Sequence, residues 1–410
     1  MNVFRRHALV GASLLSLALA GASTVVHAQI AVSANDGKMR LDNGVTKVVK
    51  DGVDSIDIID FNSSPPKVLG SVKAPTSLVG PPTSVAVSPN EEFALVTAAM
   101  KIDPTDPTKQ VADDKLHVLD LVKSSGFVRN IAARVQGKQA PPAYEPKVIA
   151  TVQVGQGPAG VSINKAGTLA LVANRSEGTV SVLEIKGKTV TAIGEKIKLG
   201  DAKSGPSAVS FTPDGKTALV TRDGDHKISV LAVDGTTVTD TKREISAGLR
   251  PYGLDVSSKG DVAVVANIGT NSGDPDTISV IDLAAKPPRV VNTVSVGQTP
   301  EGIKISPDGN YVAITVMNGT NKAKDSPFFN EQGKLVILRR QGRDLARVGE
   351  ANIGKWCQGV VWSSNSRKVA AQCVVEEQIM AFSWNGRQLQ PAGTVKVSSG
   401  GPGGIRTAEK

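Results

Sequence analysis

The sequence predicts an all-β protein in which units of four antiparallel strands repeat around a ring, and three observations lead to this prediction. Short apolar runs alternate with turns rich in Asn, Asp and Gly, which is typical of antiparallel strands joined by tight turns. One such stretch recurs along the chain, opening at Pro158, Pro206, Pro251 and Pro300, at spacings of 48, 45 and 49 residues. An all-β repeat of this length is the signature of a β-propeller.

The stretch 158–183 defines the repeat. Its first strand is the apolar run 161–163, and the polar turn after it ends at Gly167. The second strand covers 169–173, and the third, in which β-branched residues alternate, covers 179–185. Each run is too short for a stable helix and suits a strand of a compact sheet.

Further copies of the repeat set the number of units, which we call blades. One opens at Pro82 and another near Gln358, while the two ends of the chain each carry part of a copy. Residues 54–60 match a third strand, and residues 401–405 match a first strand with nothing after it. We therefore predict seven four-stranded blades, with the N- and C-terminal strands sharing one blade, because this closure removes exposed sheet edges.

The turn sequences resemble those of a known family. Ser-Pro-Asp-Gly occurs at 306–309, Thr-Pro-Asp-Gly at 212–215, and Ala-Asn-Arg at 173–175 is followed by Thr-Val-Ser-Val at 179–182. These motifs resemble the YVTN-type repeat of bacterial seven-bladed β-propellers and also the lactonase-like propellers. The resemblance covers nearly all of residues 29–410. It implies the fold, and a family that contains structural, ligand-binding and enzymatic members.

Residues 1–28 have the pattern of a secretory signal. A basic start around Arg5 and Arg6 precedes an apolar run at 8–20, and Val-His-Ala at 26–28 fits a cleavage site. The apolar run is too short to span a bilayer as a stable helix. We expect export by the general or the twin-arginine route, no transmembrane segment, and a single propeller domain over 29–410 in the periplasm, with the extracellular space as the alternative.

Composition and charge narrow the classes of partner. The formal net charge is +9, but the basic residues are scattered and are not interleaved with aromatic residues, which argues against nucleic-acid binding. We expect a monomer that binds an anionic small molecule, an envelope polymer or a partner protein. The two cysteines, Cys357 and Cys373, are equidistant from Asn365 in a predicted hairpin turn, so that they face each other and form a disulfide in an oxidising compartment.

Long connections indicate the face on which function lies. In a propeller, the segment entering each first strand and the connection between second and third strands lie on one face. The connection between second and third strands is lengthened at 101–115, 268–276 and 318–333. The insertion at 123–146 instead joins third and fourth strands on the opposite face. Loops longer than the scaffold requires often carry function.

The candidate site residues come from several blades and are expected on that long-loop face. They combine cations, carboxylates and aromatic rings, a set that suits an anionic or polyhydroxylated ligand. The candidates from second-to-third connections are Arg175, Arg222, Asp223 and His226, and those from the entries to first strands are Arg250, Tyr252, Glu301, Lys355 and Trp356.

Motifs for metals and cofactors are absent from the sequence. Asp223 with Asp225, and Asp274 with Asp276, are paired carboxylates in Gly-rich turns, but no complete calcium loop surrounds them. Outside the predicted signal only His117, placed in a strand, and His226 remain. We therefore expect no metal and no cofactor.

Three functions remain open. The first is an exported propeller that binds a ligand or partner protein on its long-loop face without catalysis. The second is a lactonase- or lyase-like enzyme acting on an anionic or sugar-acid substrate. Some seven-bladed relatives use His, Glu and Arg at the channel mouth, and His226, Glu301 and Arg250 or Arg222 could here transfer protons and hold an anion. The third is an accessory subunit of a periplasmic redox enzyme.

Overall fold

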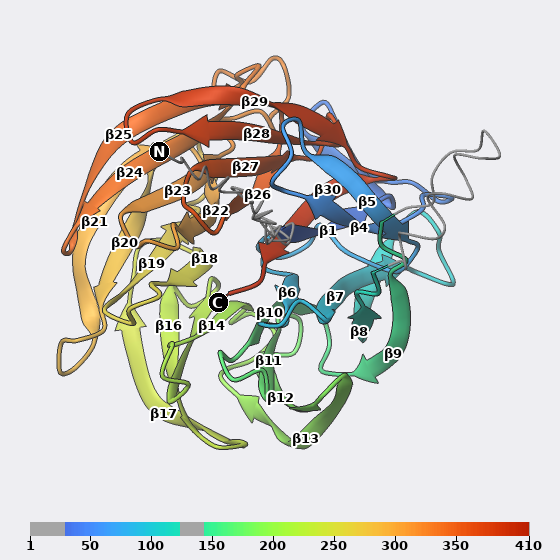
Figure 1. Cartoon of the computed structure of the whole chain (residues 1–410), viewed down its shortest axis with the longest axis vertical. Helices are drawn as coiled ribbons and strands as arrows, with labels where there is room; N and C mark the ends of the chain where they lie inside the picture. Colours follow the sequence, from blue (N-terminus) through green and yellow to red (C-terminus); the bar gives the residue numbers. More distant parts are fainter. Residues whose placement is uncertain (1–28, 124–142, 410) are drawn as a thin grey trace, which may run out of the picture.

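The computed structural model describes residues 29–123 and 143–409, so the predicted signal at 1–28 lies outside the described residues. The described part consists of strands and turns, and seven four-stranded antiparallel sheets surround a central channel (Figure 1). The predicted seven-bladed β-propeller is confirmed. No helix in these two ranges is both long enough and apolar enough to cross a membrane.

Each blade runs from an inner strand beside the channel to an outer strand at the rim. From inside to outside, the strands of the blades are as follows: blade 1, β30 (Gly401–Thr407), β1 (Ile30–Asp36), β4 (Ser55–Asp60) and β5 (Lys67–Val72); blade 2, β6 (Val85–Val87), β7 (Phe93–Ile102), β8 (Gln110–Asp120) and β9 (Lys147–Gln153); blade 3, β10 (Pro158–Ile163), β11 (Leu169–Asn174), β12 (Thr179–Lys186) and β13 (Thr189–Lys198); blade 4, β14 (Pro206–Phe211), β15 (Thr217–Arg222), β16 (Lys227–Asp234) and β17 (Thr237–Ser246).

The remaining blades follow the same order. Blade 5 contains β18 (Pro251–Val256), β19 (Val262–Asn267), β20 (Asp276–Asp282) and β21 (Arg289–Gly297); blade 6 contains β22 (Pro300–Ile305), β23 (Tyr311–Val316), β24 (Gly333–Gln341) and β25 (Asp344–Ile353); blade 7 contains β26 (Cys357–Trp362), β27 (Lys368–Cys373), β28 (Gln378–Trp384) and β29 (Leu389–Lys396). A separate hairpin consists of β2 (Met39–Asp42) and β3 (Val45–Val48).

The two ends of the chain close the ring, as predicted. The C-terminal strand β30 is the inner strand of blade 1 and pairs antiparallel with β1, from Ala31 opposite Thr407 to Asp36 opposite Gly401. All seven residues of β30 are buried. The last strand of the chain is therefore a structural element of the channel wall.

The glycine of the repeated Pro-x-Gly opening is required by the close approach of neighbouring inner strands. A Cβ atom at Gly160, Gly253 or Gly302 would lie 2.1–2.4 Å from a backbone oxygen of the next blade. Such distances are far below van der Waals contact, so only glycine fits. The glycines thus hold the inner strands in a tight ring.

Buried threonines of the second strands tie blades 2, 4 and 6 to the blade that follows each of them. The Thr97 hydroxyl donates to the carbonyl oxygen of Ala159 at 2.8 Å, and the Thr221 hydroxyl donates to that of Tyr252 at 2.9 Å. These bonds give inner-strand carbonyl groups a hydrogen-bond partner in the neighbouring blade. Between the blades, interleaved Val, Ile, Leu and Ala side chains form the core.

The predicted disulfide is confirmed. Cys357 lies opposite Cys373 in the β26–β27 ladder, with their Cα atoms 3.9 Å apart, and the two sulfur atoms are bonded. Both residues are fully buried.

The connections differ from the prediction in two places. The segment 101–115 is largely not a loop, because β7 continues to Ile102 and β8 begins at Gln110, so that a long hairpin projects from blade 2. The β2–β3 hairpin, which joins the second and third strands of blade 1, was not predicted from the sequence. Of the insertion at 123–146, residues 124–142 lie outside the described residues.

Candidate functional site

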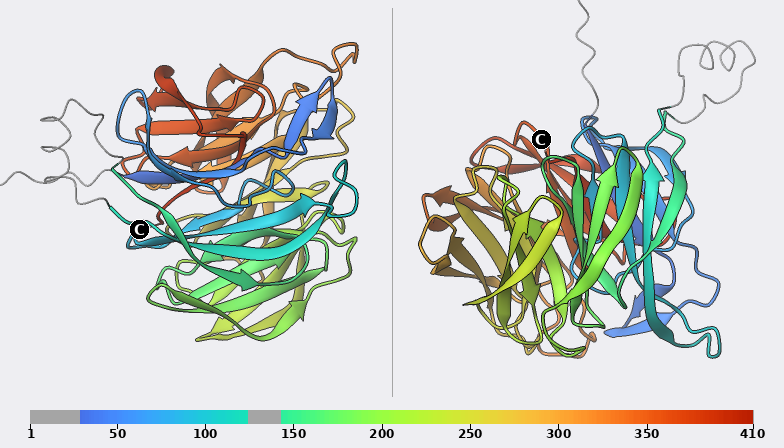
Figure 2. Two further views of the ribbon diagram at one scale, coloured as in Figure 1. Left: turned by 90° about the vertical axis from the view of Figure 1, so that its right-hand side faces the viewer. Right: turned by 90° about the horizontal axis from the view of Figure 1, so that it is seen from below.

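The inner strands all run in the same direction through the ring, which gives the channel two distinct mouths. We call the mouth at their N-terminal ends, which includes the second-to-third connections, the entry mouth. The mouth at their C-terminal ends, which includes the first-to-second turns, is the exit mouth. Figure 2 shows the β2–β3 hairpin (blue) projecting on the entry side.

The β2–β3 hairpin covers part of the entry mouth. Its residues Met39 and Leu41 pack against a buried apolar cluster that contains Met317 and Trp356. At its turn, the Asn43 side-chain oxygen accepts a hydrogen bond from the backbone N–H of Lys324 at 2.9 Å, so blade 1 reaches the long connection of blade 6. Blades 3 to 5 and the entries to blades 6 and 7 carry the predicted polar residues.

Arg175 and Asp223 form the centre of the polar cluster at the entry mouth. The Arg175 guanidinium contacts both carboxylate oxygens of Asp223, with Nη2 and Oδ2 at 2.9 Å, and also contacts the Ser207 hydroxyl. Burial alone would raise the pKa of Asp223, but Arg175 and Ser207 outweigh burial and hold the pKa below its usual range. Asp223 is therefore ionised, and its side chain is only 3% exposed.

Arg250 adds a second cation to the same carboxylate. Its Nη2 lies 3.2 Å from Asp223 Oδ2, and its side chain is 36% exposed. The backbone of Arg250 has φ +56°, and the corresponding positions before β10 and β14 are Gly157 and Gly205. Thr299 before β22 (φ +54°) and Trp356 before β26 (φ +49°) share this left-handed conformation, so it belongs to the entry turn of the repeat and is strained wherever a non-glycine residue occupies it.

Tyr252 lies beneath Arg175. The Arg175 guanidinium carbon is 5.6 Å from the centre of the Tyr252 ring, a cation–π geometry. Burial raises the pKa of the Tyr252 hydroxyl above its usual range, so the ring is neutral. Its position fixes the height of Arg175 above the channel wall.

Glu301 supplies the titratable group of the cluster. It is 6% exposed, and burial raises its pKa to about 8, although the side chain of Gln358 and the charge of Arg250 lower it. Its oxygen Oε2 and the Gln358 oxygen Oε1 are buried without a hydrogen-bond partner among the described residues. With Glu301 mostly protonated at neutral pH, Arg175 and Arg250 outnumber Asp223 and leave a net positive charge.

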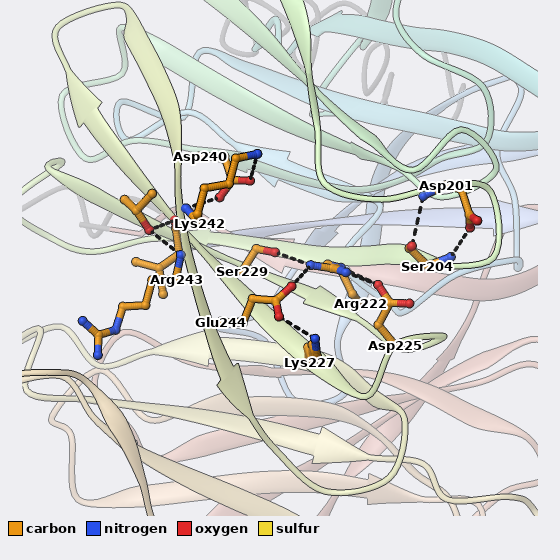
Figure 3. A network of polar contacts seen from close by, with 12 residues as sticks. Asp201, Ser204, Arg222, Asp225, Lys227, Ser229, Asp240, Lys242, Arg243 and Glu244 are labelled. Atoms are coloured by element: carbon orange, nitrogen blue, oxygen red, sulfur yellow. Dashed lines mark hydrogen bonds and ion pairs between the residues drawn. The ribbon is translucent and has the colours of Figure 1, made fainter.

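The structure places other predicted residues outside this cluster. Arg222 is directed into blade 4, where it bonds Asp225, Glu244 at 2.6 Å and Ser229 at 3.1 Å (Figure 3). Trp356 is 9% exposed within the apolar cluster below the hairpin.

Two more of the predicted residues lie at the margin. His226 Nδ1 accepts a hydrogen bond from the backbone N–H of Arg250 at 3.2 Å, so it supports the loop. Lys355 pairs with Glu331. His117 is buried in β8, and its Nδ1 lies 3.1 Å from the Thr151 hydroxyl oxygen.

Two residues of the cluster were missed by the sequence analysis. Ser207 and Gln358 occupy the same position of the repeat as Tyr252 and Glu301, the residue after the opening of the inner strand. Aligning this position across the blades would have found them, since it places one side chain per blade at the entry mouth.

A cavity lies at the exit mouth, where the sequence analysis expected no site. Its volume is about 310 Å³, and first-to-second turns such as Asn164–Lys165 and Thr212–Pro213 line it. The C-terminal segment from Arg406 to Glu409 also contributes to its wall. The chain therefore carries polar clusters at both mouths.

Comparison with known proteins supports the fold. Residues 144–275 match the family model described as lactonase, 7-bladed beta-propeller. No curated protein matches the chain. A candidate 6-phosphogluconolactonase of Bacteroides fragilis is similar in structure, with a TM-score of 0.67 at 15% identity over 94% of this chain and 99% of that chain.

Two further solved structures extend the comparison. The periplasmic gluconolactonase of Pseudomonas aeruginosa has a TM-score of 0.63 at 16% identity, over 92% of this chain and 99% of that one. Hydrazine synthase of Kuenenia stuttgartiensis has a TM-score of 0.55 at 20% identity, over 76% and 79%. Identities this low show the fold alone. The protein is a seven-bladed β-propeller that resembles the lactonase-like propellers, as its repeats predicted.

Proposed function

We propose that the entry mouth binds a sugar acid or its lactone and that the protein hydrolyses the lactone. The observation that carries this proposal is the cluster of Arg175, Asp223, Arg250, Tyr252 and Glu301. It brings two arginines, one ionised carboxylate and one proton-carrying carboxyl group together from neighbouring blades.

Arg250 is the residue proposed to hold the anion. Its side chain is more exposed than that of Arg175, at 36% against 24%, and it makes a single contact to Asp223. A guanidinium can pair with a carboxylate or a phosphate through two parallel hydrogen bonds. Arg175 is held by Asp223 and Ser207, and its positive charge also favours an anion beside Arg250.

Glu301 is the residue proposed to transfer the proton. In lactone hydrolysis, water adds to the carbonyl carbon, the ring C–O bond breaks, and the proton from water reaches the ring oxygen, which leaves as a hydroxyl group. A pKa near 8 suits a group that must both accept and return a proton near neutral pH. Arg250 would stabilise the negative charge that develops on the carbonyl oxygen.

The comparisons support this choice of substrate class. Two similar structures are a candidate 6-phosphogluconolactonase and a periplasmic gluconolactonase, and the matching family model is a lactonase model. The buried disulfide supports export to an oxidising compartment, for which we propose the periplasm.

The test combines binding and turnover on residues 29–410. Calorimetry with gluconate measures binding, and turnover of glucono-δ-lactone is followed between pH 6 and 8 with spontaneous hydrolysis subtracted. We expect kcat/KM to rise with pH towards an inflection near 8 and Glu301→Gln to lower it about 100-fold or more.

The matched control is Arg243→Ala, which removes an exposed arginine of outer strand β17 and should change neither binding nor turnover. Binding without turnover would leave the entry mouth as a non-catalytic binding site. Failure of both gluconate and lactone to bind would overturn the proposal.

A further inference from the structure

The exit-mouth cavity contains a buried ion pair that the proposed chemistry at the entry mouth does not use. Lys304 Nζ lies 2.7 Å from Asp255 Oδ1, and the two side chains are 12% and 5% exposed. Asp255 Oδ2 accepts a hydrogen bond from the backbone N–H of Ile305 at 2.8 Å. Both oxygens of Asp255 are thus engaged, while the ammonium group of Lys304 still has donors to offer.

The C-terminal segment supplies the second carboxylate. After β30 ends at Thr407, residues 408 and 409 continue at the exit mouth, where they line the cavity. Glu409 Oε1 contacts Lys304 Nζ, which joins the end of blade 1 to blade 6. The Glu409 side chain remains 62% exposed and belongs to no strand.

Arg406 adds another cation to the cavity wall. It is 9% exposed, and the one hydrogen bond described for its guanidinium goes to the backbone oxygen of Ile405 at 3.1 Å. Asp255 neutralises only one of the two cations. Without Glu409, the cavity would therefore carry an uncompensated positive charge, which is costly to bury and attracts an anion.

We propose that the exit-mouth cavity is a binding site for a small carboxylate, and that Glu409 occupies it as a displaceable internal ligand. Glu409 already shows the chemistry that the site accepts, since a carboxylate oxygen meets a buried ammonium group. The volume of about 310 Å³ is at the lower end of small-molecule sites. The inference is independent of the function proposed for the entry mouth.

Displacement is feasible because the contact of Glu409 is partly solvated. An ion pair with one exposed partner contributes little to stability. However, a tethered carboxylate two residues beyond a strand has an effective concentration in the millimolar range. An external carboxylate must compete with it, so the unaltered chain should bind such ligands weakly.

The experiment measures citrate binding by calorimetry at low ionic strength, using residues 29–410. We expect Glu409→Gln, and a chain that ends at Ala408, to bind citrate roughly tenfold more tightly or better than the unaltered chain. The matched control is Glu331→Gln, because Glu331 is similarly exposed, at 66%, and pairs with Lys355 at the entry mouth. That control should leave citrate affinity unchanged.

Further variants assign the gain to the cavity. In the Glu409→Gln background, Lys304→Met and, separately, Arg406→Gln should each abolish the gain in citrate affinity. If Lys304→Met fails to fold, Arg406→Gln alone provides the test. Arg250→Ala in the same background should leave the gain intact, which separates this site from the entry mouth. The proposal is overturned if Glu409→Gln binds citrate no more tightly than the unaltered chain, or if the gain survives Arg406→Gln.

Discussion

The two mouths of the channel are built from the ends of the same seven strands, but they neutralise their cations differently. At the entry mouth, Arg175 and Arg250 share one buried carboxylate, Asp223, and both guanidinium groups remain partly exposed. At the exit mouth, Lys304 is enclosed by Asp255 and by Glu409 from the C-terminal segment. At the exit mouth, unlike the entry mouth, the C-terminal segment supplies one of the carboxylates that neutralise the cations.

This difference indicates how one ring can carry an external and an internal ligand site. At the exit mouth, the charged residues Asp255, Lys304 and Arg406 lie near the C-terminal ends of inner strands. At the entry mouth, Arg175 and Asp223 follow second strands and Arg250 precedes an inner strand. Only the exit mouth is crossed by a terminal segment of the described chain. We therefore expect the entry mouth of the unaltered chain to bind ligands from solution. Changes in the C-terminal residues should alter ligand binding at the exit mouth.

The largest effect is expected when the chain is cut before Gly401. This deletion removes β30, the buried inner strand of blade 1, together with the segment that reaches the exit mouth. The ring would be open and the edge of β1 exposed, so cooperative unfolding should be lost and aggregation should appear. Circular dichroism and size-exclusion chromatography check this. A chain ending at Ala408 is the control and should keep its melting temperature within a few degrees; a stable monomer lacking β30 would contradict the closure.

A smaller but still large effect is expected from the titration of Glu301. The pKa of its carboxyl group is about 8 in the folded protein, against 4.5 as the ordinary value. Between these values the folded state retains a proton that the unfolded state has released, so the free energy of unfolding falls as pH rises. The penalty is absent below pH 4.5 and complete above about 8.

Glu301→Gln removes that penalty at the entry mouth. We expect its stability relative to the unaltered chain to increase by on the order of 3–4 kcal/mol between pH 5 and pH 8.5. Urea unfolding at both pH values measures the difference. Parallel pH dependences of the two proteins would show that Glu301 titrates normally.

The disulfide is expected to contribute about 2–3 kcal/mol, because it closes a short loop of sequence separation 16. The change is the replacement of both Cys357 and Cys373 by Ala, measured by urea unfolding. Cys357 precedes Gln358 in β26, so the loss should disturb the entry mouth and leave citrate binding by Glu409→Gln unaffected. Two free thiols in the protein purified without reductant, found by mass spectrometry, would be the contrary result.

The two arginines of neighbouring connections should separate binding from stability. Arg250→Ala should weaken gluconate binding by about 1.5–3 kcal/mol. Arg222→Ala should leave binding unchanged and lower the free energy of unfolding by roughly 1–2 kcal/mol, since Arg222 bonds within blade 4. Equal losses of binding in both variants would indicate diffuse attraction.

The smallest effect concerns the strained backbone of Arg250. Arg250→Gly should stabilise the fold by up to about 1 kcal/mol, because glycine adopts its φ of +56° without cost. The same variant should lose gluconate binding. A loss of stability in thermal unfolding would show that the side chain, and not the backbone, dominates at this position.

The architecture could be predicted from the sequence because each blade repeats the same requirements. Gly253, two residues after Pro251, must be glycine because the backbone of the next blade lies against it. The paired cysteines directly indicate one hairpin. The ring closure followed from the unmatched strands at the two ends of the chain.

The direction of single side chains could not be predicted in the same way. Arg222 ends a second strand, as Asn174 and Asn267 do, and like them it bonds third-strand hydroxyls inside the blade. The charge of Arg222 made it a candidate for ligand binding, whereas its position in the strand directs its side chain into the sheet. Glu409 gave no signal, since its contact with Lys304 crosses the channel and depends on no repeat.

The most direct test of the different roles of the two mouths is a crystal structure of residues 29–410 grown with gluconate. We predict density for the gluconate carboxylate on the guanidinium of Arg250, near Glu301, with Glu409 still on Lys304. Gluconate bound only at the exit mouth, with Arg250 making no contact to it, would contradict the account.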